Sequence, residues 1–267
     1  MPPAPGRRRG EGAAAMAIDY VKRPGGGGAD RAPAISPEKL QDRAPGLVNL
    51  YKSAAVSLRK HGLGGVRAAV YLVLDRSGSM RPYYRDGSVQ RLAEQVLGLA
   101  AHFDDDGQVP VVFFSTGVDG VAEVSLDDYA GRIGAVHDAL GHMGRTHYHL
   151  AMQAVIDHYL HSGTSAPALV VFQTDGGPSS RSAAERVLCE SAKLPMFWQF
   201  IGFGQDDFRF LRKLDDLPVP KKRVVDNAGF FPAGQDPAAV PDEVLYDRLT
   251  EEFPQWLRAA GAAGILR

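Results

Sequence analysis

The sequence has a single cysteine, lacks any long apolar run, and has almost no net charge. Because Cys189 is alone among 267 residues, an intramolecular disulfide framework is excluded. No apolar run approaches the roughly 20 residues of a membrane-spanning helix, and the apolar patch 13–18 is too short for a secretory signal. A formal net charge of −1 favours neither a nucleic-acid partner nor a membrane surface. We therefore expect a cytoplasmic protein.

Charge is distributed unevenly along the chain. Residues 1–67 contain 12 Lys/Arg and 5 Asp/Glu, whereas the remainder contains 18 and 26. Residues 1–45 are rich in proline and glycine and contain few aliphatic residues, which predicts a disordered basic tail. Residues 46–67 are more apolar, with an alternation at 56–59 that is typical of a short strand, and we expect them to dock on a main domain at 68–260.

Apolar runs alternate with segments of helical periodicity through the rest of the chain. This alternation predicts a Rossmann-like, doubly wound α/β fold with a mostly parallel six-stranded sheet, one antiparallel edge strand and helices on both faces. We expect strands at 68–75, 109–115, 121–125, 167–174, 196–202 and 222–226, and helices at 88–103, 127–140, 147–161, 181–192, 206–214 and 242–260, the last broken at Pro254.

The most informative stretch follows the first of these strands. An apolar run ends in Asp75, and Ser77 and Ser79 follow it at alternate positions. In open α/β sheets ligands bind at the carboxyl ends of the strands. One carboxylate and two hydroxyls are hard oxygen ligands of the kind that Mg²⁺ or Mn²⁺ takes. A strand-ending aspartate followed by a simple Ser-Gly turn is the alternative.

Two further positions support the first interpretation. Another apolar run, 168–172, leads into Thr174, Asp175 and a Gly-Gly turn, so that Asp175 is expected at the same sheet edge. Thr146 precedes a segment of helical periodicity, where it would either cap the helix or turn its hydroxyl toward an ion.

The D-x-S-x-S motif, a distant threonine at a helix start and T-D-G after another strand together resemble the metal-ion-dependent adhesion site of von Willebrand factor A domains. The resemblance implies a metal ion, Mg²⁺ or Mn²⁺, and an open coordination position that is filled by an acidic side chain of a partner protein. It also implies which residues form the site: Asp75, Ser77, Ser79, Thr146 and Asp175. His147 departs from the small polar or acidic residue common in that family.

Several other segments resemble the A-domain proteins of bacterial tellurium-resistance (Ter) stress systems. They are 66–72, 83–90, 141–146, 197–202 and 224–231. This resemblance implies a scaffold role in a tellurium-resistance or chemical-stress complex, with other Ter-type stress proteins as partners. It implies no enzymatic activity.

Alternative functions remain at this point. A hydrolase that uses the same strand end is one, although Ser77 stands where an aspartyl-nucleophile phosphatase needs a carboxylate, and no G-x-S-x-G is present at this strand end. A structural α/β domain without metal is another. Arg76 and Arg145 flank the site and are interpreted either as attractants for an acidic partner or as ordinary surface charge.

Overall fold

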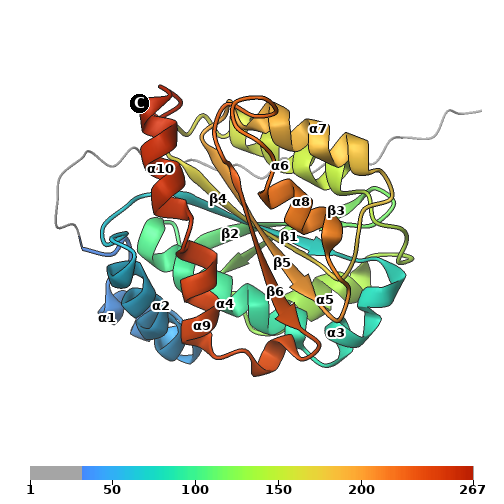
Figure 1. Cartoon of the computed structure of the whole chain (residues 1–267). Helices are drawn as coiled ribbons and strands as arrows, with labels where there is room; N and C mark the ends of the chain where they lie inside the picture. The colour runs from blue at the N-terminus through green and yellow to red at the C-terminus, as the bar shows by residue number, and fades with distance from the viewer. Residues whose placement is uncertain (1–31, 267) are drawn as a thin grey trace, which may run out of the picture.

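The computed structural model describes residues 32–266, which contain a six-stranded sheet flanked by helices on both faces (Figure 1). The strand order is β3-β2-β1-β4-β5-β6. Only the β2–β3 pair is antiparallel, and β3 lies at the edge. The expected α/β fold is therefore confirmed. The strands are β1 (Ala69–Asp75), β2 (Gln108–Phe114), β3 (Val118–Ser125), β4 (Ala168–Thr174), β5 (Met196–Phe203) and β6 (Ala228–Gly234).

The helices divide between the two faces of the sheet because successive strand residues point to opposite sides. On β1, Val70 and Leu72 join an apolar cluster with α2, α4, α9 and α10, whereas Tyr71 and Val73 join another with α6, α7 and α8. Figure 1 shows these two layers. The helices are α1 (Pro37–Arg43), α2 (Val48–Lys60), α3 (Arg81–Arg85), α4 (Ser88–Phe103), α5 (Arg132–Ala139), α6 (Tyr148–His161), α7 (Arg181–Ser191), α8 (Arg209–Asp215), α9 (Asp242–Thr250) and α10 (Phe253–Ala262).

The two central strands explain the long apolar runs of the sequence. Every residue of β1 and of β4 is buried. A parallel strand covered by helices on both faces has no solvent side to supply alternating polar residues. Edge strand β3, by contrast, has buried residues only at Ala122 and Val124. The chain passes from β1 outward to β3 and then returns to β4 beside β1, so a topological switch point lies between β1 and β4.

The amino-terminal part of the described chain differs from the expectation of disorder up to residue 45. Residues 1–31 of that expected tail lie outside the described residues. Within the rest, Ser36 caps α1 by accepting a 3.2 Å hydrogen bond from the Lys39 amide, and Leu40 is fully buried. The alternating residues 56–59, expected as a strand, belong to α2, because Tyr51, Ala54 and Leu58 recur at helical spacing and are buried.

The carboxyl-terminal part contains one wrong prediction and one that is confirmed. The last strand is β6 at Ala228–Gly234 and not 222–226. The helical stretch 242–260 is broken before Pro254 into α9 and α10, as expected. No helix within residues 32–266 has the length and apolar character required to span a bilayer.

Candidate metal centre at the carboxyl edge of the sheet

The site forms where β1 and β4 end side by side, at the switch point of the sheet. Asp75 is the last residue of β1 and is fully buried. Its Oδ1 accepts a 2.6 Å hydrogen bond from the Ser77 amide, and its Oδ2 accepts one of 2.6 Å from Thr174 Oγ1 at the end of β4. These two donors fix the orientation of the carboxyl group.

Two serine hydroxyls and a second carboxyl group lie just beyond the strand ends. Ser79 Oγ donates to Asp175 Oδ1 at 3.0 Å, and Ser77 Oγ donates to the same oxygen at 3.5 Å. The two serine oxygens are 3.2 Å apart. Ser77 is buried and Ser79 is exposed, so this group of oxygens opens to solvent on the Ser79 side. The structure thus brings four of the five predicted residues into one polar cluster.

The fifth residue, Thr146, belongs to a segment held between the loop that follows β1 and the loop that follows β4. The Gly78 amide donates to the Gly144 carbonyl at 3.2 Å, and the Ser179 amide donates to the Thr146 carbonyl at 2.8 Å. Thr146 is half-buried, and among the described contacts none joins its hydroxyl to the other four residues. His147, not Thr146, is the N-cap of α6. The capping role considered for Thr146 is therefore wrong.

Gly144 is required for this close approach. A Cβ atom built on Gly144 would lie 2.3 Å from Thr116 Oγ1 and 3.0 Å from Ser115 Oγ, at the end of β2. Any side chain would push the segment 144–146 away from the strand ends. The glycine thus brings the backbone of Thr146 to the edge where the two aspartates lie.

The electrostatics of the site favour a cation. Burial raises the pKa of the Asp75 carboxyl to about 7, although hydrogen bonds from Thr174 and Ser77 oppose the shift. Burial also raises the pKa of Asp175, against the hydrogen bonds from the two serines. Neither carboxylate has an ion pair among the described residues. Buried negative charge without a counter-charge is costly. Two carboxylates and two hydroxyls are hard oxygen donors, so this set fits a divalent cation.

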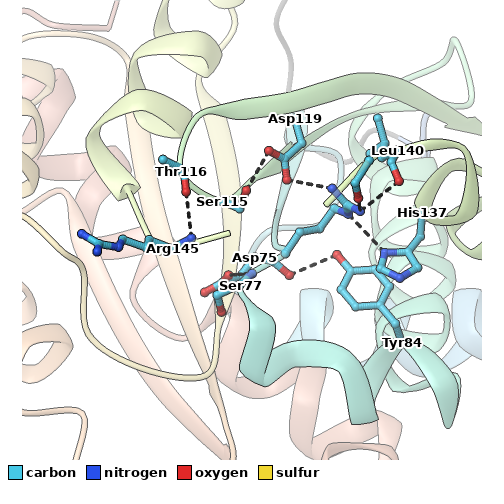
Figure 2. A network of polar contacts seen from close by, with 11 residues as sticks. Asp75, Ser77, Tyr84, Ser115, Thr116, Asp119, His137, Leu140 and Arg145 are labelled. Atoms are coloured by element: carbon cyan, nitrogen blue, oxygen red, sulfur yellow. Dashed lines mark hydrogen bonds and ion pairs between the residues drawn. The ribbon is translucent and has the colours of Figure 1, made fainter. Parts of the chain in front are cut away.

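Arg76 does not supply that counter-charge, because its side chain points into the protein. It is 1% exposed, and its Nη1 is 2.8 Å from Asp119 Oδ2 on β3. Its Nε donates to His137 Nδ1 at 3.1 Å, and Nη2 donates to the Gly141 carbonyl at 2.9 Å (Figure 2). The interpretation of Arg76 as surface charge or partner attractant is therefore wrong. Arg145, by contrast, is exposed.

The partners of Arg76 link the strand end to the neighbouring loops. Arginine only donates hydrogen bonds, so His137 accepts at Nδ1 and is neutral. Burial and the nearby Arg76 charge lower the pKa of His137, consistent with this state. The His137 ring stacks on Tyr84 at 4.0 Å, and the Tyr84 hydroxyl donates to the Asp75 carbonyl at 3.1 Å (Figure 2).

Sequence reasoning missed the supporting residues of this site. Thr174 directly precedes the predicted Asp175, but nothing in the local sequence pattern indicates that its hydroxyl faces Asp75. Asp119 and His137 lie 43 and 61 positions from Arg76, so only the folded chain reveals the pairing. Within residues 32–266 there is no group of three or more His, Cys, Asp or Glu placed to hold a metal ion. Asp75 and Asp175 therefore have hydroxyl groups, and not a third carboxylate or an imidazole, as their polar neighbours.

The chain is similar to several known proteins. Residues 67–266 match the family model described as the vWA found in the TerF C terminus. The uncharacterized protein YcbR of Bacillus subtilis (strain 168) is 37% identical over 220 residues, which cover 81% of this chain and 88% of that protein. Among solved structures, a von Willebrand factor type A protein from Catenulispora acidiphila has 20% identity and a TM-score of 0.47, over 73% of this chain and 43% of that one. The manganese-loaded TRAP protein of Plasmodium vivax has 18% identity and a TM-score of 0.45, over 69% and 74%.

Proposed function

The chain belongs to the von Willebrand factor A family, in the type found at the TerF C terminus, and we propose that it is a divalent-cation-dependent protein-interaction module. Asp75, Ser77, Ser79, Thr146 and Asp175 would hold Mg²⁺ or Mn²⁺. The cation, when bound, supplies a position for a carboxylate of a partner protein. The residues of this chain orient the oxygen ligands and leave the Ser79 side open to solvent.

One observation carries the proposal. Two carboxyl groups with raised pKa values lie beside each other at the switch point of the sheet, share hydrogen bonds with serine hydroxyls, and have no cationic partner among the described residues. A structural domain without metal would gain nothing from this arrangement, because burying carboxylates without a counter-charge is unfavourable. A bound divalent cation offsets that cost.

We propose that the module has no catalytic activity. The described hydrogen bonds of the Ser77 and Ser79 hydroxyls lead only to each other and to Asp175. An activated serine nucleophile needs an adjacent general base, most often histidine, oriented by a third group. His137, an imidazole beside this strand end, accepts a hydrogen bond from Arg76 instead.

The family type supports a more specific role. We propose that the protein acts as a scaffold in a bacterial tellurium-resistance or chemical-stress complex, with an acidic side chain of another Ter-type protein as its ligand. Affinity capture from cells treated with tellurite, in Mg²⁺ and in a chelator, tests this role. We expect a partner that is retained only in Mg²⁺ and is lost with Ser79→Ala; capture that is insensitive to both would contradict it.

Cation binding itself is tested by titration calorimetry and thermal unfolding with Mg²⁺ and Mn²⁺. Saturating cation at 100-fold its Kd should stabilise the fold by about 2.7 kcal/mol. Asp175→Asn should abolish the heat of binding and the stabilisation. Asp105→Asn is the matched control, because Asp105 is exposed in the loop that leads into β2, at the amino ends of the parallel strands. Equal behaviour of the two variants would contradict the proposed site.

A further inference from the structure

A second polar pocket lies at the amino-terminal end of β6, at the opposite end of the parallel strands from the candidate metal centre. It has a volume of about 860 Å³ and lies between the end of α8, the loop 215–226 and helix α10. Figure 1 shows α10 at the opposite end of the molecule from α3, the helix that follows the Asp75 motif. The pocket is therefore separate from the candidate metal centre.

Arg223 is the buried cation of this pocket, and one of its nitrogens lacks a partner. The residue is 2% exposed. Its Nε donates to the Leu217 carbonyl at 3.0 Å, and its Nη2 contacts the Asp215 carbonyl and lies 2.7 Å from Asp226 Oδ1. Among the described residues, the buried Nη1 has no hydrogen-bond acceptor. An unpaired buried donor costs free energy that a ligand acceptor recovers.

The carboxyl groups of the pocket exceed its cations. Asp215, Asp216, Asp226 and Glu252 all line it, and Arg223 is the one basic residue among the described lining. Burial, and then the charges of Asp226 and Asp216, raise the pKa of Asp215 to about 6. Burial, and then the charges of Asp215 and Asp226, raise the pKa of Glu252 to about 7. The pocket therefore holds four carboxyl groups against one guanidinium, and a positively charged ligand would stabilise their ionised forms.

The remaining walls indicate the kind of cation. No three carboxylates within residues 32–266 are arranged to hold one metal ion. The other walls are apolar: Val219 and Val224 are 45% and 44% exposed, and the small side chain of Ala259 on α10 also lines the pocket. Dispersed carboxylates beside an apolar wall fit an extended organic cation with an aliphatic stem. Lysine and arginine side chains are of this kind, since they bury the stem against apolar surface and keep the charged head group in a polar environment.

We propose that this pocket binds a lysine or arginine side chain of a partner peptide, with a peptide carbonyl of the same residue accepting from Arg223 Nη1. The charged head lies among Asp215, Asp216 and Glu252, and the alkyl stem lies along Val219 and Val224. The protein then presents two recognition sites of opposite preference, one for an acidic side chain and one for a basic side chain. They lie at opposite ends of the parallel strands of one sheet.

Titration calorimetry on the full chain, with N-acetyl-lysine-N-methylamide as the probe, tests the pocket. We expect binding of this probe, and no measurable binding of the neutral norleucine analogue. n-Pentylamine carries one ammonium group on the same alkyl stem without the carbonyl, and loss of the hydrogen bond to Arg223 should weaken its binding about tenfold. Equal binding of n-pentylamine would overturn the assignment to a peptide, and equal binding of the norleucine analogue would overturn the charge recognition.

Two charge-neutral variants complete the test. Glu252→Gln and Asp216→Asn should each weaken the lysine probe about tenfold. Glu251→Gln is the matched control. The Glu251 side chain is next to Glu252 in the sequence, but it is exposed and pairs with Arg248 outside the pocket. Thermal unfolding verifies that all three variants fold. An affinity unchanged in Glu252→Gln and Asp216→Asn, or no binding to the wild-type protein, would overturn the proposal.

Discussion

Thr174 donates a 2.6 Å hydrogen bond from its Oγ1 to Asp75 Oδ2, which ties the last residue of β4 to the last residue of β1. The Tyr148 hydroxyl on α6 lies 3.2 Å from the same Oγ1. A hydroxyl that donates to a buried carboxyl group supports its ionised form and fixes its direction. Thr174 thus helps to hold Asp75 in the state and orientation that a cation requires.

Replacement of this threonine tests its contribution. Thr174→Val keeps the shape and removes the donor, so we expect a loss of about 1–3 kcal/mol in the free energy of unfolding at pH 8, where Asp75 is ionised. Mg²⁺ affinity should fall in the same variant. Thr174→Ser keeps the hydroxyl and should retain most of both properties. Urea unfolding and calorimetry measure the two effects; equal losses in both variants would assign the effect to packing alone.

The raised pKa of Asp75 predicts how stability depends on pH. Burial raises the folded-state pKa to about 7, above the ordinary aspartate value of 3.8, so the folded protein binds more protons than the unfolded chain between these values. The Asp75 contribution to metal-free stability therefore falls as pH rises from about 4 to about 7. We expect Asp75→Asn to gain stability relative to wild type over this range in a chelator.

The difference between wild type and Asp75→Asn isolates this group. His102 acts in the opposite direction, because burial lowers its pKa to about 4 and acid therefore favours the unfolded chain, but His102 is the same in both proteins. Denaturant unfolding at pH 5 and pH 8 measures the difference. Saturating Mg²⁺ should make the wild-type protein the more stable of the two at pH 8, since the cation stabilises only the wild-type carboxylate. A pH-independent difference would contradict the assignment.

The buried Arg76–Asp119 pair predicts a large cost for losing one partner. Arg76→Met leaves Asp119 without its cation and His137 without its donor, and we expect about 3–5 kcal/mol of destabilisation. Arg145→Met is the control: Arg145 is exposed nearby, and its replacement should change stability by no more than about 0.5 kcal/mol. Adding Asp119→Asn to Arg76→Met should cost less than the two single changes combined. Additive losses would show that the pair is not coupled.

The close approach of Gly144 to β2 predicts a specific effect on the metal site. Gly144→Ala places a methyl group 2.3 Å from Thr116 Oγ1, which must displace the segment that carries Thr146. We expect a stability loss of about 1–3 kcal/mol and weaker Mg²⁺ binding. Gly141→Ala is the matched control, because a Cβ there meets nothing within 4 Å. Unfolding and calorimetry compare the two, and unchanged Mg²⁺ affinity in Gly144→Ala would argue against a role for Thr146.

The strands and helices of the core were predictable because their patterns are local. The buried run 68–75 and the helix 88–103 agree with β1 and α4 to within one residue. The prediction failed at β6, where Val224 and Val225 favour a strand on propensity alone. The chain instead loops there, because Arg223 is tied to the Leu217 carbonyl, and β6 forms at 228–234 by pairing with β5. Pro232 is tolerated there because β6 lies at the edge of the sheet.

The sequence by itself determined the fold class and a set of oxygen ligands, because apolar runs that end in Asp75 and Asp175 must bring both aspartates to the carboxyl edge of a parallel sheet. Only the tertiary structure decided which groups surround them. It turned Arg76 inward to Asp119, placed Thr174 against Asp75, and gathered Arg223 and Glu252 around a separate pocket. These contacts join residues far apart in the chain, and their geometry depends on strand register and helix packing, which no local pattern specifies.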